Sequence, residues 1–235
     1  MPYLSRTDIE RIAEPVIAQY KRSFVPEKHL CYNVDPVALA SMLGLRIDYQ
    51  YLSEKGKILG MTSADEVCVT VLDSQRKEVM YFLDGNTILV DRRLRESGKL
   101  VGRMNFTTSH EIAHQIIYRL YPELYGPDCR VFCDYRRSER PRKKINDWEE
   151  WQADSLAAAL LLPLDAIQDA MFIHGLGEKM KVLSRKYSEN NYIRFCEMAE
   201  FLGASKSALA FRMEQFGLLE RNELIAEAKA MRGVA

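Results

Sequence analysis

The octapeptide TSHEIAHQ, residues Thr108–Gln115, constrains this chain more than any other stretch, because it places two histidines four residues apart beside a glutamate. On a helix, positions i and i+4 lie about 40° apart around the axis, one turn above the other. His110 and His114 therefore project from one side and are spaced to bind one tetrahedral metal ion. Glu111 lies about 100° from His110, beside such an ion rather than on it, as a general base for a metal-activated water must be.

The residues around this octapeptide predict a helix over about residues 98–120. Apolar residues at helical spacing fill an arc of roughly 140° next to the histidines: Phe106, Ile112, Ala113, Ile116, Ile117 and Leu120. This pattern puts both imidazoles at the border of the buried face. The alternative is a surface pair of histidines without a metal, but average residue usage produces His-Glu-x-x-His in only on the order of 0.5% of chains this long.

A zinc ion that keeps one position open for water needs a third protein ligand. A second helix, expected over 147–162, has one alanine-rich face with a carboxylate pair at its start: Glu150, Ala153, Asp154, Ala157, Ala158 and Leu161. Alanines let two helices approach closely, so Glu150 is the predicted third ligand and Asp154 the partner of a free histidine ring nitrogen. Asn146 and Glu149 resemble a capping box at the start of this helix. Glu149 is the rival ligand, but it lies off the alanine face.

The rest of the chain predicts an α+β fold with a small mixed sheet. Helices are expected at Ile9–Phe24 and Pro36–Leu43, and several more follow after residue 164. Short β-branched or aromatic runs indicate strands at 45–49, 66–71, 79–83 and 87–90, with Asp84-Gly85-Asn86 as a hairpin turn between the last two. We expect one domain over 1–165 and a helical segment over 166–235.

Two motifs in register resemble those of a known family. Asn105 to His114 (NFTTSHEIAH) resembles the Phe-Thr-x-Ala-His-Glu-x-x-His signature of the ImmA/IrrE metallopeptidases, with Ser109 in place of the usual alanine. Glu150 to Pro163 (EWQADSLAAALLLP) is similar to that family's Glu-x-x-Ala-Asn/Asp-x-Phe-Ala-Ala-x-Leu-Leu-x-Pro. The interval between His114 and Glu150 is longer than is typical. The resemblance covers roughly residues 9–165.

The resemblance implies a zincin-like domain that acts as a zinc-dependent endopeptidase. Its substrate would be a helix-turn-helix repressor that controls phage, mobile-element or stress genes. One zinc ion would be bound by His110, His114 and Glu150, and Glu111 would be the catalytic base. We also expect the strand formed by Thr87, Ile88, Leu89 and Val90, read as an edge strand before the active-site helix, to hold an extended substrate by strand addition.

The composition of the chain bears on whether it binds nucleic acid or a membrane. Lysine plus arginine equals aspartate plus glutamate at 33 each, so no overall field recruits nucleic acid or an anionic membrane. The longest apolar stretch runs from Leu156 to Leu164, which is too short to span a bilayer. The five scattered cysteines fit reduced thiols in a cytoplasmic protein.

Two segments leave alternatives open. The loop 129–144 carries seven basic and two acidic residues, a net charge of +5. It is either a solvated insertion beside the cleft or a surface for DNA or an acidic partner. Within it, Cys129 and Cys133 are read as reduced thiols rather than a second metal site.

The segment Ile193–Met213 resembles a helix-turn-helix with Gly203 at the turn. Its second helix offers only Lys206, Arg212 and Gln215 to a nucleic acid. We therefore expect a helical pair that packs on the peptidase or docks its protein substrate, and no direct DNA binding. The alternative function is a DNA-binding regulator with a structural or sensory zinc domain. The oligomeric state does not follow from the sequence.

Overall fold

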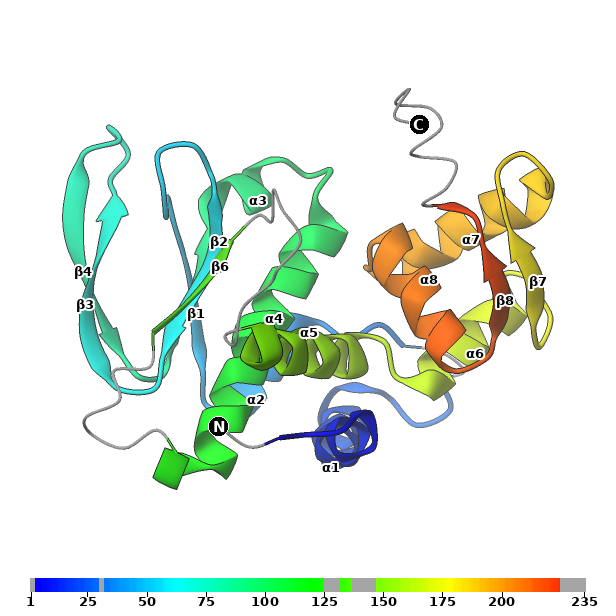
Figure 1. The fold of residues 1–235 in the computed structure, drawn as a ribbon, viewed down its shortest axis with the longest axis horizontal. Coiled ribbons are helices and arrows are strands. Elements are labelled where there is room, and N and C mark those ends of the chain that lie inside the picture. Colours follow the sequence, from blue (N-terminus) through cyan, green and yellow to red (C-terminus); the bar gives the residue numbers. More distant parts are fainter. Residues whose placement is uncertain (1–2, 30–31, 125–131, 137–146, 225–235) are drawn as a thin grey trace. The chain divides into compact units, whose positions relative to one another are not determined.

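The computed structural model describes residues 3–29, 32–124, 132–136 and 147–224, and its fold is α+β as predicted (Figure 1). The chain forms two compact units. The first contains Met1–Phe24 and Asp35–Leu161, and the second contains Val25–Val34 and Leu162–Ala235. The division falls after Leu161 rather than after residue 165, and the second unit also takes a short segment from near the N-terminus.

The first unit combines helices with two sheets. Its helices are α1 (Arg6–Phe24), α2 (Pro36–Met42), α3 (Arg92–Glu96), α4 (Val101–Leu120), the 3-10 turn η1 (Pro122–Leu124) and α5 (Asp147–Leu161). Its strands are β1 (Arg46–Gln50), β2 (Ile58–Ser63), β3 (Glu66–Leu72), β4 (Glu78–Asp84), β5 (Thr87–Asp91) and β6 (Phe132–Arg136). The sequence does not predict the strands β2 and β6, and β6 lies within the predicted loop 129–144.

The main sheet has the strand order β1-β5-β2-β6. Strand β5 is parallel to β1 on one side and antiparallel to β2 on the other, and all five of its residues are buried. The prediction of a substrate-binding edge strand at Thr87–Val90 is therefore wrong. The run Thr-Ile-Leu-Val is apolar at consecutive positions, which is typical of a central strand covered on both faces. The edges of this sheet are β1 and β6.

Strands β3 and β4 form a separate two-stranded sheet that is paired along seven residues of each strand. Val69, Val71 and Leu83 of this hairpin join a buried cluster with Leu89 of β5. The predicted hairpin between β4 and β5 is wrong, because these two strands belong to different sheets. Asp84-Gly85-Asn86 is still a turn: the Asp84 carboxylate accepts from the Asn86 backbone N–H at 3.1 Å, and Gly85 has a φ of +73°.

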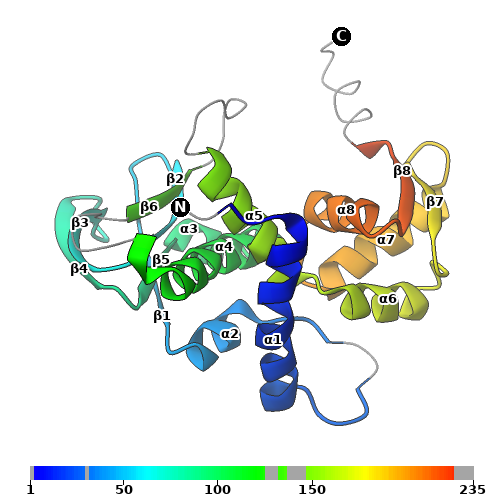
Figure 2. The ribbon, with the colours of Figure 1, turned by 60° about the horizontal axis from the view of Figure 1, so that its bottom comes forward.

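Helix α4 is the centre of the first unit, since it packs against β2 on one side and α5 on another, and α1 packs along α5 (Figure 2). Every residue from Thr107 to Tyr118 is buried. The prediction that the histidines lie at the border of a buried face is therefore wrong, because neighbours cover the helix all round. Gln115 fixes α4 against β2 by donating to Thr62 Oγ1 and to the Ser63 carbonyl, both at 2.7 Å.

The second unit contains α6 (Leu164–Ile173), β7 (Met180–Leu183), α7 (Glu189–Phe201), α8 (Lys206–Gln215) and β8 (Leu219–Asn222). Helices α7 and α8 form the predicted helical pair, with Gly203 in the turn at a φ of +61°. In the described part of the chain, no single helix has the length and apolar composition to cross a membrane. The consecutive helices Trp148–Leu161 and Leu164–Ile173 reach that length and composition only when counted together, across a bend.

Candidate metal centre

Two helices bring three metal-ligand side chains together in the first unit. His110 and His114 come from α4 and Glu150 from the first turns of α5, and one ligand atom from each lies within 4.8 Å of the others. The two Nε2 atoms are 3.1 Å apart, and the Glu150 oxygens lie 3.4 Å from His110 Nε2 and 3.5 Å from His114 Nε2. Ligands about 2.0–2.1 Å from a tetrahedral ion are about 3.3–3.4 Å from one another. The three spacings fit three corners of such a tetrahedron, so the group could hold a metal ion.

Asp154 orients the first histidine. One turn after Glu150 on α5, its Oδ1 lies 2.9 Å from His110 Nδ1. When Nδ1–H of His110 donates its hydrogen bond to Asp154, the lone pair of Nε2 faces His114 and Glu150, as a metal ligand requires. A carboxylate behind a ligating imidazole also makes the imidazole a stronger donor. The roles predicted for Glu150 and Asp154 thus match their positions.

The electrostatics of the site are those of two buried imidazoles beside carboxylates. Burial alone would lower the pKa of His110, but hydrogen bonds to Asp154 and Glu150 and the charge of Glu111 outweigh it and raise the pKa to about 9. Burial lowers the pKa of His114. Burial would raise the pKa of Glu150, but the two histidines hold it far below its usual range. The site is thus a compact group of buried ionisable side chains in which carboxylates face imidazoles, where a cation is favoured.

Glu111 is fully buried and does not belong to the ligand set. Its carboxylate lies against β2, where Gly60 faces it. A Cβ built on Gly60 would stand 2.5 Å from Glu111 Oε1, 2.9 Å from Glu111 Cγ and 2.8 Å from Thr107 Cγ2. The base predicted from the sequence is therefore held between its own helix and a strand that the sequence did not reveal.

The start of α5, which carries Glu150, is anchored by the segment before α1. The Leu4 backbone N–H donates to Gln152 Oε1 at 2.7 Å, and Gln152 is fully buried. Tyr3 stacks on Trp148 with ring centroids 4.6 Å apart, and Trp148 stacks on Trp151 at 4.5 Å. These contacts restrict the movement of the N-terminal end of α5, on which Glu150 lies.

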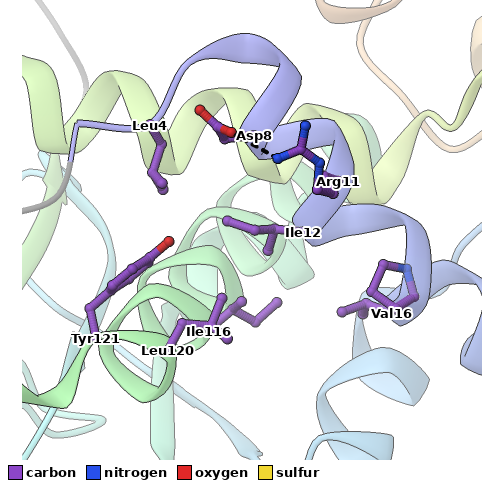
Figure 3. A pocket seen from close by; sticks show the side chains of 9 residues that line it. Leu4, Asp8, Arg11, Ile12, Val16, Ile116, Leu120 and Tyr121 are labelled. Carbon is purple, nitrogen blue, oxygen red and sulfur yellow. Dashed lines mark hydrogen bonds and ion pairs between the residues drawn. The ribbon is translucent and has the colours of Figure 1, made fainter.

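The ligand group is exposed on one side only. The side chains of His110 and His114 have no exposed surface, whereas those of Glu150 and Asp154 are 21% and 34% exposed. Solvent therefore reaches the group at the carboxylates of α5. A separate cavity of about 400 Å³ lies between α1 and the end of α4 (Figure 3). Leu4, Ile12, Val16, Ile116 and Leu120 are among its lining residues, and none of the metal-ligand group lines it.

The structure brings His110, His114, Glu150 and Asp154 together, and it places Glu111 beside them. It puts Thr87–Val90 in the middle of the sheet instead. Asn146, Cys129 and most of the loop 129–144 lie outside the described residues. Sequence reasoning missed Gly60 and Gln115, which set the spacing between α4 and β2. An apolar run with a glycine, Ile58-Leu59-Gly60-Met61, was the available signal for β2.

Comparisons of the chain with protein-family models and with curated proteins found no match.

Proposed function

We propose that this chain is a zinc-dependent endopeptidase that resembles the ImmA/IrrE family. The observation that carries the proposal is the group of two histidines and one glutamate in tetrahedral spacing, with a second glutamate, Glu111, beside it and outside the ligand group. A structural zinc site is usually closed by four protein ligands. Among the described residues this group has three. Three protein ligands would leave the fourth position of a tetrahedral zinc ion open for a water molecule.

The donor set favours zinc over other divalent ions. Two imidazole nitrogens and one carboxylate oxygen are the ligand types of hydrolytic zinc sites, whereas Mg²⁺ and Ca²⁺ take oxygen ligands in larger number. In zinc sites a histidine ligand commonly donates its other ring N–H to a carboxylate, and the Asp154 contact to His110 is of this kind. When bound, zinc would lower the pKa of a coordinated water and polarise the carbonyl of the bond to be cut.

The remaining chemistry belongs to this chain's own side chains. The Glu111 carboxylate takes the proton of the attacking water and delivers it to the amine nitrogen that leaves. Its burial removes competing water and strengthens each electrostatic contact it makes. Asp154 keeps the His110 ring in one orientation through the reaction.

The open edge of the main sheet suggests where an extended peptide would bind. Strand β6 pairs with β2 on one side, and no described strand pairs with its other side. It contacts α4, and it is separated by one strand from β5, where we had expected the substrate. A peptide added to β6 would make backbone hydrogen bonds of the kind that extended ligands use. A helix-turn-helix repressor as the substrate, and a cytoplasmic location, rest on the family resemblance and the composition.

The alternative, a DNA-binding regulator, receives less support from α8. On that helix Arg212 is buried and donates to the Leu162 carbonyl at 3.1 Å, so it is engaged within the protein. The exposed residues of α8 are Lys206, Ser207, Phe211, Glu214 and Gln215, which include one cation and one carboxylate. A helix that reads DNA exposes more cationic and amide side chains.

The test is Glu111→Gln, which keeps the shape of the side chain and removes the base. The purified or co-expressed chain is combined with candidate helix-turn-helix repressors, beginning with any encoded beside its gene, and cleavage is followed on gels. We expect zinc content near that of the wild type and a fall in cleavage of at least 10²-fold, the low end for losing a general base. If Glu111→Gln retains zinc and cleaves at the wild-type rate, the proposed mechanism is wrong.

A further inference from the structure

We infer that Gly60 of β2 is a positioning residue for the general base, because its missing side chain provides the space in which the Glu111 carboxylate lies. The inference rests on the proposed function for its consequence in catalysis. Its structural content, that Gly60 and Glu111 compete for one volume, can be tested without any activity.

The backbone does not require glycine at this position. Eight other glycines have a positive φ, between +59° and +73°, but Gly60 is not among them. Any residue could adopt its extended conformation within β2. The reason for glycine is therefore space, since an added Cβ would meet Glu111 Oε1, Glu111 Cγ and Thr107 Cγ2 at 2.5–2.9 Å. These separations are shorter than van der Waals contact allows.

The helix cannot slide away from an added methyl group. Gln115, fully surrounded one turn after Glu111, holds α4 to the next residues of β2 through the Thr62 hydroxyl and the Ser63 carbonyl. On its other side α4 packs against α5. With the backbones fixed on both sides, the added atom must displace the side chain of Glu111 or Thr107.

The local geometry of β2 also supports a positioning role for Gly60. The pairing register of β2 with β6 shifts between Ile58 and Gly60, so a bulge directly precedes the glycine. Bulges beside active sites redirect the strand and its side chains. Gly60 also pairs with Val90 of β5, so it is a ladder position and not part of a loop.

The consequence for catalysis is specific. The three atoms nearest to an added Cβ belong to Glu111 and Thr107 and not to a histidine ligand, and Glu150 lies on α5, so Gly60→Ala should leave zinc binding intact. The base should move by a fraction of an ångström to about one ångström, which is enough to lower kcat by roughly 10- to 100-fold with little change in KM. Glu111→Ala removes both Glu111 atoms that the added Cβ would meet, Cγ and Oε1, and should make room for the alanine at position 60.

The first experiment measures thermal unfolding of the zinc-free chain for Gly60→Ala, Glu111→Ala and the double variant. Overpacking should lower the Tm of Gly60→Ala by roughly 3–10 °C, and the same substitution should cost less than half of that shift in the Glu111→Ala background. Gly102→Ala, a half-buried position in the first turn of α4, is the matched control and should not lower Tm. Equal losses with and without Glu111→Ala would overturn the inference.

The second experiment measures zinc content and kinetics on the repressor. We expect one zinc per chain in Gly60→Ala, a reduced kcat, and no further loss when Gly60→Ala is added to Glu111→Gln, since the base is already gone. A further loss in the Glu111→Gln background would assign Gly60 a general structural role and overturn the inference. If the wild type cleaves nothing, the proposed function fails, and the unfolding experiment still decides whether Gly60 positions Glu111.

Discussion

Both ring nitrogens of His110 contact a partner side chain, and this explains why the site needs Asp154 as well as Glu150. Nδ1 faces the Asp154 carboxylate at 2.9 Å, while Nε2 faces His114 at 3.1 Å. Asp154 and Glu150 lie one turn apart on α5, so a single helix supplies both the third ligand and the group that orients the first. The two carboxylates therefore have different tasks, and their substitutions should have different effects.

The ligand assignment predicts the metal content of three variants. His110→Ala and Glu150→Gln should lose most of the bound zinc, because alanine offers no ligand and a neutral amide is a poorer one than a carboxylate. Asp154→Asn should retain zinc with an affinity lowered by roughly 10- to 100-fold. Metal analysis of each purified protein against the wild type, expected at one zinc per chain, is the measurement. Equal zinc in the wild type and His110→Ala would refute the site.

The side chains of this site differ in how far they could be predicted. His110, Glu111 and His114 follow from the spacing within one helix, and Glu150 and Asp154 follow from the spacing within another. Gly60 could not be predicted, because its role depends on the distance between a strand and a helix about 50 positions further along the chain. For the same reason the full burial of the histidines was missed: one helix gives its own apolar face but not the neighbours on its other sides.

The element that carries the third ligand is restrained by aromatic stacking, and this leads to a prediction about Tyr3. Tyr3→Ala removes the ring that stacks on Trp148 near the start of α5. A stacked pair contributes about 0.5–1.5 kcal/mol, so the apparent zinc affinity should fall by up to about tenfold as this helix end loosens. Competition with a zinc chelator measures the change. Tyr187→Ala, another exposed tyrosine, is the control and should bind zinc like the wild type; equal affinities for the two variants would contradict the prediction.

Among the elements, helices were predicted better than strands. The helices α1, α4 and α5 appear within a few residues of their expected bounds, because their periodic patterns are long. The edge position assigned to β5 was wrong, since strand order depends on pairing partners far away in the sequence. Strand β2 was missed because its residues are almost all buried and show no alternation of apolar and polar side chains.

The chain as a whole is electrically neutral, with 33 basic and 33 acidic residues, and this bears on nucleic acids. Together with the buried Arg212 of α8, neutrality predicts no specific binding to duplex DNA at physiological salt. A gel-shift titration over a range of salt concentrations is the measurement. A sequence-dependent shift at nanomolar protein would favour the regulator over the peptidase.

The second unit is assembled from two separate stretches of the chain, and this has a consequence for how the protein is made. Residues 25–34 leave the ribosome before Asp165, but Tyr32 donates to Asp165 Oδ1 at 2.7 Å across a separation of 133 residues. At the usual 5–20 residues per second, this segment waits about 7–27 s for its partner. During that time the apolar residues of the segment, Val34 among them, are exposed to chaperones. The first unit must then fold while the segment 25–34 still lacks its contact with Asp165.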